Sequence, residues 1–282
     1  MSLLALKKVW FFILTVSIIF SLTSVSCREK SKSDNSGVVF DTIQVNKSQS
    51  IDYKESKINC NLHIAFIYPI TCKKTSALSD LQKLFIEKVF PAQYADLSPK
   101  DAVNNFSEKY LQDFRSIKAE DYVLEDENSF IYELSLEDEI RYNRNNFISF
   151  VVKNVSNEGG AQEVSNSIYG YVIDLNTGKF LTEEDFAGNN YKKNLSSIIV
   201  KKIAASKNLQ DVSQLETIVG YNDIKTIVPN DNFILDDKGI TYYFNEGEIA
   251  AGFVGITEVF IPYEELKSYI TDDNPISSLV GL

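Results

Sequence analysis

Apolar and polar residues alternate strictly from Ile58 onward, where the pattern of the chain first becomes regular. Alternation over this length is typical of a strand with one buried face. The positions predicted to face the core are Ile58, Cys60, Leu62, Ile64, Phe66 and Tyr68. Residues 129–143, 146–155 and 167–175 are also predicted to be strands, and the second of these is expected inside the sheet because both of its faces are apolar.

Helical spacing of the apolar residues replaces alternation at residues 76–90 and 98–114. The second of these helices is expected to begin with Ser98 as its N-cap and Pro99 as its first residue. Its predicted buried face consists of Val103, Phe106, Tyr110 and Phe114.

The second half of the chain predicts a mixture of short elements. A helix is expected from Tyr191 to Ile203, and a shorter one near residues 211–218. Two strands are expected around a turn at Gly239, and residues 255–270 predict a strand that runs into a helix with Pro262 as its first residue.

Together these elements predict an α+β fold, with a mainly antiparallel sheet and helices inserted on one side. We expect two sub-domains packed together, at residues 57–165 and 166–282.

Residues 1–26 have the layout of a secretory signal peptide. Lys7 and Lys8 precede an apolar run, and small residues lead up to Cys27. The uncharged stretch is near the short end of the range for a membrane span, ~17–25 residues, so a retained membrane anchor is the alternative.

The end of this segment, Ser24-Val25-Ser26-Cys27, resembles a bacterial lipoprotein signal, in which the cysteine is acylated and becomes the first residue. Leu is usual where Ser24 stands, and the signals of Bacteroidetes-like bacteria are relaxed at this position. The resemblance implies a lipoprotein held by its lipid in the cell envelope, on the periplasmic or the surface side of a membrane such as the outer membrane. Each buried CH₂ of the lipid contributes about 0.8 kcal/mol.

Residues 27–56 predict a flexible tether, because Ser, Lys, Asp and Asn dominate and few large apolar residues are present. Within it, Asp41-Thr42-Ile43 resembles the three-residue O-glycosylation signal of Bacteroidetes. Thr42 is therefore a candidate modification site, with an unmodified linker threonine as the alternative.

The composition indicates a folded, acidic protein. Of the 282 residues, 44% are hydrophobic and 12% aromatic, which is enough for a core. The net charge of −11 disfavours nucleic acid as a partner. The charge suits a cationic partner, although acidity also serves solubility.

The chain has one histidine, His63, which excludes zinc sites built from several histidines. We expect a structural or surface histidine, and neither a metal nor a cofactor. Cys60 and Cys72 would lie ~40 Å apart in an extended strand, too far for a disulfide unless the chain reverses near Pro69. Two buried, unpaired thiols are favoured.

Four groups of acids are the remaining candidates for chemistry. They are Glu137–Glu139, Glu183–Asp185, Asp236–Asp237 and Glu264–Glu265. Glycoside hydrolysis needs two carboxyls that face each other across a cleft, which adjacency in sequence does not provide. First turns of helices and strand edges favour acids for structural reasons, so no catalytic residue is assigned.

Residues 239–270 resemble the C-terminal envelope domain of the lysozyme-responsive anti-sigma factors (RsiV-like). The resemblance rests on the Gly239 turn, the strand 242–244, the step 248–250, Gly255 and the segment 261–266, and residues 172–187 and 64–70 extend it upstream. The same domain occurs in bacterial lipoproteins and beside peptidoglycan deacetylase domains. The family commonly has Asn-Pro-Tyr before Glu248, where this chain has Asn245-Glu246-Gly247.

The resemblance implies a non-enzymatic envelope lipoprotein, tethered through Cys27, whose ligand is a lysozyme-like protein or peptidoglycan. Two alternatives stay open: an envelope glycan hydrolase that uses a carboxylate pair, and a purely structural envelope protein.

Overall fold

The computed structural model describes residues 37–53, 56–73, 78–116, 131–158, 164–271 and 273–281. The chain divides into two compact units, Met1–Ser31 and Lys32–Leu282, and all of the described residues belong to the second. The predicted signal peptide and lipidation at Cys27 lie outside the described residues, so both stay predictions.

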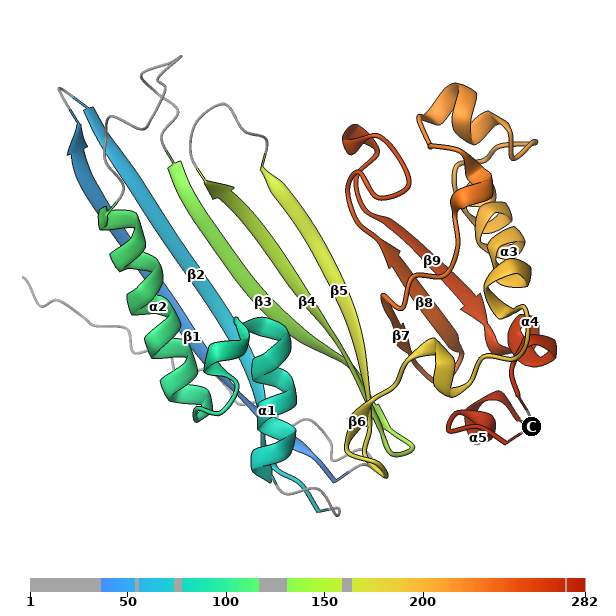
Figure 1. Cartoon of the computed structure of the whole chain (residues 1–282), viewed down its shortest axis with the longest axis horizontal. Coiled ribbons are helices and arrows are strands. Elements are labelled where there is room, and N and C mark those ends of the chain that lie inside the picture. Colours follow the sequence, from blue (N-terminus) through green and yellow to red (C-terminus); the bar gives the residue numbers. More distant parts are fainter. Residues whose placement is uncertain are drawn as a thin grey trace, which may run out of the picture. The chain divides into compact units, whose positions relative to one another are not determined.

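Six strands form one large sheet, in the order in which they occur along the chain (Figure 1). They are β1 (Val39–Tyr53), β2 (Ser56–Thr71), β3 (Ile131–Arg144), β4 (Phe147–Glu158), β5 (Ser165–Asp174) and β6 (Lys179–Phe180). Neighbouring strands are antiparallel except β2 and β3, which are parallel. Because β2 and β3 are parallel, the chain must return from the end of β2 to the end of the sheet at which β2 begins. The long helical connection between the two strands does this.

β1 corrects the prediction that the tether extends to residue 56. Residues 39–53 pair with β2 along almost their whole length. Ile43 and Val45 pack against the main core of this sheet, and Ile51 packs against a smaller cluster. An edge strand with one buried face needs few apolar residues, and the polar residues between these three concealed the alternation.

Two helices, α1 (Leu78–Val89) and α2 (Pro99–Ser116), lie against one face of the large sheet (Figure 1). Both were predicted, and the backbone N–H of Asp101 donates to Ser98 Oγ at 3.2 Å, which confirms Ser98 as the N-cap. The ring of Phe85 in α1 stacks on that of Phe150 in β4, with centroids 4.3 Å apart. Aromatic packing of this kind joins the helical layer to the sheet.

The C-terminal part contains a second sheet of three short antiparallel strands, with α3 packed against it. These elements are α3 (Tyr191–Ser206), β7 (Phe233–Leu235), β8 (Gly239–Phe244) and β9 (Thr257–Pro262), followed by α4 (Tyr263–Leu266) and α5 (Ser277–Val280). The shorter helix expected near 211–218 is a π-helical turn at Leu215–Val219.

Pro262 is the last residue of β9 and the N-cap of α4, not the first residue of the helix as predicted. Its extended ψ of 149° explains the difference, because the helix starts only at the next residue. None of the helices in the described ranges combines the length and the apolar content needed to cross a membrane.

The expected boundary between residues 165 and 166 falls inside the large sheet, because β4 and β5 are paired neighbours. The two sheets are also linked by buried groups. Ser149 Oγ donates to Leu235 O at 2.7 Å, and a Cβ at position 170 would lie 2.7 Å from the carbonyl of Phe233. Glycine thus permits the close approach of β5 and β7. The predicted fold class, a mainly antiparallel α+β structure, is confirmed.

Cys60 and Cys72 are free, as predicted. Cys60 is buried on the core face of β2, and burial raises the pKa of its thiol to about 11. Cys72 follows the end of the same strand and is only partly buried, which corrects the expectation of two buried thiols. β2 continues without reversal through Pro69, so the two residues stay at different places along an extended strand.

Candidate functional site

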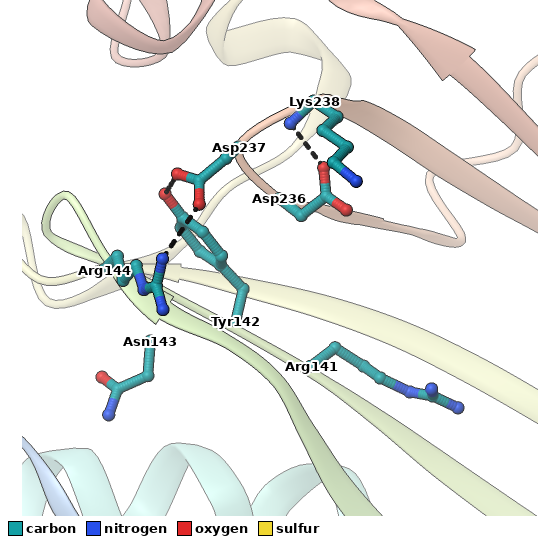
Figure 2. Close-up of a pocket in the computed structure, with 7 residues that line it drawn as sticks. All are labelled: Arg141, Tyr142, Asn143, Arg144, Asp236, Asp237 and Lys238. Carbon is teal, nitrogen blue, oxygen red and sulfur yellow. Dashed lines mark hydrogen bonds and ion pairs between the residues drawn. The ribbon is translucent and has the colours of Figure 1, made fainter. Parts of the chain in front are cut away.

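A pocket of about 250 Å³ lies where the end of β3 meets the turn between β7 and β8 (Figure 2). Its lining consists of Arg141, Tyr142, Asn143, Arg144, Asp236, Asp237 and Lys238. The lining contains three cationic side chains, two carboxylates, a phenol and an amide. Such a set can form hydrogen bonds with the hydroxyl, amide or carboxylate groups of a ligand.

Asp237 is held by several donors from the end of β3. Tyr142 Oη donates to its Oδ1 at 2.7 Å, and Arg144 Nη1 donates to its Oδ2 at 3.3 Å (Figure 2). Burial, together with the hydrogen bond to Asp237 and the charge of that residue, raises the pKa of Tyr142 above its usual value. The phenol therefore stays neutral at physiological pH and acts as the donor in this pair.

Asp236 has a different role from Asp237, because its carboxylate stabilises the turn that leads into β8. Its Oδ1 accepts hydrogen bonds from the backbone N–H groups of Lys238 and Gly239, at 2.6 and 3.0 Å. Tyr263 Oη donates to the carbonyl of Asp236 at 2.8 Å. The adjacent pair Asp236–Asp237 is thus divided between two separate hydrogen-bond networks.

The cations of the pocket are less fully engaged. Arg141 pairs with Glu139 at 3.2 Å on the rim, where both side chains are well exposed. In the described ranges, the Lys238 ammonium forms no ion pair. The spare binding capacity of the pocket is therefore cationic, which suits a carboxylate or hydroxyl group of a ligand.

The face of the large sheet opposite α1 and α2 carries polar pairs. Ser48 Oγ donates to Asn61 Oδ1 at 2.8 Å, and Ser50 Oγ donates to Asn59 Oδ1 at 2.7 Å. A second pocket, of about 280 Å³, lies on this face toward β5. It is lined by Ser135, Glu137, Lys153, Val155, Asn166, Ser167, Ile168 and Ile256.

A third pocket, of about 250 Å³, lies at the edge of β5. Its lining is Tyr169, Gly170, Tyr171, Asn230, Asp231, Asn232, Asn245 and Glu248. β6 pairs with only the last two residues of β5, so amide side chains bind the backbone before them. Asn232 accepts from Gly170 N at 2.7 Å and donates to Ile168 O at 3.0 Å, while Asn245 accepts from Ile168 N at 2.8 Å.

Among the described carboxylic acids, two have a clearly raised pKa, and neither lines these three pockets. Asp138 is 4% exposed, and burial raises its pKa to about 8, although its Oδ1 accepts a hydrogen bond from Ile67 N at 2.6 Å. Glu183 is 1% exposed, and burial, together with the charge of Asp231, raises its pKa. Lys192 Nζ lies 3.4 Å from Glu183 Oε2.

The sequence contained a signal that Asp138 is buried, but treating Glu137–Glu139 as one acidic group concealed it. Position 138 falls on the apolar side of the alternation, between Leu136 and Ile140. Glu183 was equally hidden among neighbouring acids, because its burial depends on a reciprocal contact with a distant loop. Glu183 N donates to Asp231 Oδ1 at 2.8 Å, and Asp231 N donates to Glu183 Oε1 at 3.3 Å.

His63 is a partly exposed residue, in agreement with the prediction. Its Nδ1 lies 2.7 Å from Asn46 Oδ1, and its Nε2 lies 3.4 Å from Glu137 Oε1. Thr42, the candidate glycosylation site, is exposed on β1 rather than in a tether, and its modification stays a prediction.

The remaining acids, Glu264 and Glu265, are exposed in the first turn of α4, where Glu265 pairs with Lys202 at 2.9 Å. Within the described parts of the chain, no three His, Cys, Asp or Glu side chains come together as metal ligands.

Fold and pockets define an α+β protein whose C-terminal sheet is joined to a large helix-backed sheet. Residues 181–264 match the model of a family described as a protein of unknown function, DUF3298. This segment contains the Gly239 turn, Glu248 and Gly255, on which the resemblance in sequence rests.

Two crystal structures of DUF3298 family proteins are similar to this chain. One, from Bacteroides fragilis, is 26% identical with a TM-score of 0.78, and the alignment covers 88% of this chain and 98% of that one. The other, from Pseudomonas aeruginosa, is 13% identical with a TM-score of 0.54 over 83% of this chain and 95% of that one, and shows the shared fold alone. No curated protein matches the chain.

Proposed function

We propose that the protein is a non-enzymatic lipoprotein of the bacterial cell envelope, anchored through Cys27, that binds a glycan or protein ligand. The observation that carries this proposal is the state of the acids at the pocket of Figure 2. Asp236 and Asp237 are each bound by donors of the protein itself, whereas the Lys238 ammonium is not paired within the described residues. Such a pocket is suited to holding a ligand.

The positions of the shifted acids also support binding over turnover. General acid–base catalysis needs a group that exchanges a proton at the bound ligand, with a pKa near the working pH. Asp138 and Glu183 have raised pKa values, but both are buried and neither lines any of the three pockets, although Glu183 contacts Asp231 of the third.

The rival proposal, a glycan hydrolase, requires two carboxyls that converge on a cleft. Asp231 and Glu248 both line the third pocket, but protein donors bind both: Asp231 Oδ1 accepts from Glu183 N, and the Glu248 oxygens accept from Asn230 and Asn245.

For the glycan ligand, peptidoglycan is the candidate implied by the resemblance to the RsiV-like domain. Its peptide carboxylates and sugar hydroxyls suit the cationic capacity of Arg141 and Lys238. We expect the full chain to sediment with purified peptidoglycan and Lys238→Glu to reduce the bound fraction several-fold. Lys201→Glu, an equal charge change on the exposed side of α3, is the control and should bind like the wild type. If Lys238→Glu and Lys201→Glu bound peptidoglycan equally well, this pocket would not be part of the peptidoglycan-binding surface.

A protein ligand is favoured by a separate observation, an apolar tip formed by Ile218 and Phe253, which are 67% and 83% exposed. Their loops are joined by a hydrogen bond from Ala251 N to Gly220 O at 2.9 Å. The Phe253 ring also packs on Gly220, where a Cβ would lie 2.7 Å from its Cζ. A fixed, exposed aromatic ring of this kind is typical of a binding anchor.

The loops that carry the tip are acidic. Residues 211–226 and 245–258 contribute Asp211, Glu216, Asp223, Glu246, Glu248 and Glu258, against one cation, Lys225. Cleavage before Cys27 would also bring the net charge from −11 to −13 by removing Lys7 and Lys8. Opposite charge speeds encounter with a basic partner such as lysozyme.

A pull-down with lysozyme at low and moderate salt tests the protein ligand. We expect retention at both salts and a loss of at least ~10-fold in Phe253→Ser, since buried aromatic anchors contribute about 2 kcal/mol or more. Phe260→Ser is the matched control, because Phe260 is 43% exposed on β9. Absence of retention at either salt would exclude this partner.

Anchoring through Cys27 has its own test. Cells that produce the chain are labelled with a palmitate analogue, and we expect label on the wild type and none on Cys27→Ala. Label that survives the substitution would overturn the assignment. The same preparations test Thr42, because Thr42→Ala removes the mass of a glycan if that residue is modified.

A further inference from the structure

The third pocket, at the edge of β5, has the chemistry of a saccharide subsite. Its one strongly exposed aromatic ring, Tyr169, is 42% exposed and stands among planar polar side chains. The volume of about 250 Å³ is just below the ~300–1,000 Å³ usual for small-molecule sites, so it suits one ring of a larger ligand. We propose that a neutral sugar ring of a glycan stacks on Tyr169 in this pocket.

The two tyrosines on this side of β5 differ in a way that singles out Tyr169. Tyr171 is used by the core: its ring packs 5.4 Å from that of Phe150 and 5.8 Å from that of Phe180, and Lys88 Nζ lies 5.0 Å above it. In the described part of the chain, Tyr169 makes no such ring contact and its hydroxyl makes no hydrogen bond. The ring is therefore available to a ligand.

The walls of the pocket are held rigidly. Asn230 donates to Tyr243 O at 2.9 Å and to Glu248 Oε1 at 2.7 Å, while Glu248 Oε2 accepts from Asn245 N at 2.8 Å. Asp231 has φ = +57°, a left-handed conformation that Asp tolerates at a cost in free energy. Preorganised polar groups of this kind bind a ligand without a large ordering cost.

Several groups in this frame keep hydrogen-bonding capacity. Among the described residues, Asp231 Oδ2 forms a long ion pair with the Lys192 ammonium, at 3.9 Å. Each Glu248 oxygen accepts one bond from the protein and has a further lone pair, and the Asn245 amide uses its oxygen but not its Nδ2 in the described contacts. These acceptors and donors match the mixed character of sugar hydroxyl and acetamido groups.

The charge of the lining selects among ligands. The charged side chains of the lining, Asp231 and Glu248, are both anionic, which disfavours phosphates and other anions, although the Lys192 ammonium lies 3.9 Å from Asp231. The C–H groups on one face of a pyranose are weakly positive and apolar, which fits the negative face of the Tyr169 ring. A neutral saccharide, such as an N-acetylated hexosamine, satisfies both conditions.

This inference rests on the glycan branch of the proposed function and names its sugar subsite. The test titrates the full chain with the N-acetylglucosamine trisaccharide and follows binding by calorimetry and by NMR of the tyrosine ring protons. We expect Tyr169→Ala to weaken binding ~10-fold, near the lower part of the range found when the aromatic platform under a stacked nucleic-acid base is removed. Tyr169→Phe should stay within about threefold, since the ring face is kept, and should lose only the contribution of one hydrogen bond.

Phe260→Ala is the matched control, because Phe260 is 43% exposed, as Tyr169 is 42% exposed, and it should bind like the wild type. Trisaccharide binding that is unchanged in Tyr169→Ala would overturn the subsite and leave the proposed function standing. A wild type that retains lysozyme but no glycan would overturn the subsite and leave the protein branch. A wild type that binds neither lysozyme nor the trisaccharide would contradict both the sugar subsite and the protein branch of the proposed function.

Discussion

The two sheets of the protein are held together by different means. The five long strands of the large sheet have 10 to 16 residues each, and backbone ladders and helices on one face stabilise them. The strands of the small sheet have only 3 to 6 residues. Sheets this small need outside support. Here that support comes from α3 and from side chains at the junction with β4 and β5.

The comparison predicts that substitutions at this junction cost more than substitutions on the open surfaces. The largest effect is expected for Gly170→Ala, whose Cβ would lie 2.7 Å from the backbone of Phe233. Because backbone must move to accept it, the free energy of unfolding should fall by about 3 kcal/mol, at the upper end of the usual cost of overpacking. Urea denaturation measures the loss. Gly252→Ala, which meets nothing within 4 Å, is the control, and an equal loss in both variants would contradict the close approach.

Asn232→Ala is expected to be the next most damaging change. It leaves Gly170 N and Ile168 O at the edge of β5 without their partners. Backbone groups orphaned in this way cost ~1–3 kcal/mol each when buried, so we expect a loss of about 2 kcal/mol at this partly exposed site. Asn166→Ala, on the exposed start of the same strand, should change stability by less than ~0.5 kcal/mol. If the two variants unfolded alike in urea, the amide links would not be what supports the junction.

Asp138 should make the stability of the protein depend on pH. Its folded-state pKa is about 8 against 3.8 in the unfolded chain, so the folded state holds the proton more tightly. The stability from this group is complete below pH 3.8 and is lost as the pH rises toward 8, at ~1.4 kcal/mol per unit.

Asp138→Asn removes this titrating group and should reduce the fall of the unfolding free energy with pH, measured by urea denaturation at pH 5, 6 and 7, while Glu183 keeps its own contribution. Asp113→Asn, at an exposed position of α2, should keep the wild-type slope. A wild-type slope in Asp138→Asn would show that another group sets the pH dependence.

The smallest stability effect is expected at the apolar tip. Phe253 is 83% exposed, so Phe253→Ser should shift the free energy of unfolding by less than ~0.5 kcal/mol while it reduces lysozyme retention. Thermal unfolding beside the pull-down separates the two effects. A large loss of stability would make Phe253 a structural residue instead of a ligand anchor.

The same difference between the sheets decides how much of the fold could be predicted. Alternation in β2 and helical spacing in α1 and α2 identify elements of the large sheet and its cover, because each buries one regular face. β1 was not predicted because only four of its residues, Phe40, Ile43, Val45 and Ile51, are apolar and pack against the cores, so its composition is that of a tether. The boundary at 165 was wrong because a polar loop in the sequence says nothing about the pairing of β4 with β5.

The pockets could be predicted far less well. Tyr142 meets Asp237 across 95 positions of sequence, and Asn232 meets Ile168 across 64, so no local pattern links them. Most acids of the four groups identified in the sequence are exposed in the structure. Asp236 instead stabilises a turn through its carboxylate. Asp138 could have been identified from the sequence, because it occupies a position where the alternation predicts an inward-facing apolar residue.

The central claim, that the protein binds envelope glycan without cutting it, has one direct measurement. The full chain is incubated with purified peptidoglycan, and the sedimented protein and the soluble sugar fragments are measured in the same sample. The account predicts that the protein sediments with the peptidoglycan and that fragment release stays at the level of the buffer blank. Fragments released in proportion to added protein, or protein left entirely in the supernatant, would contradict it.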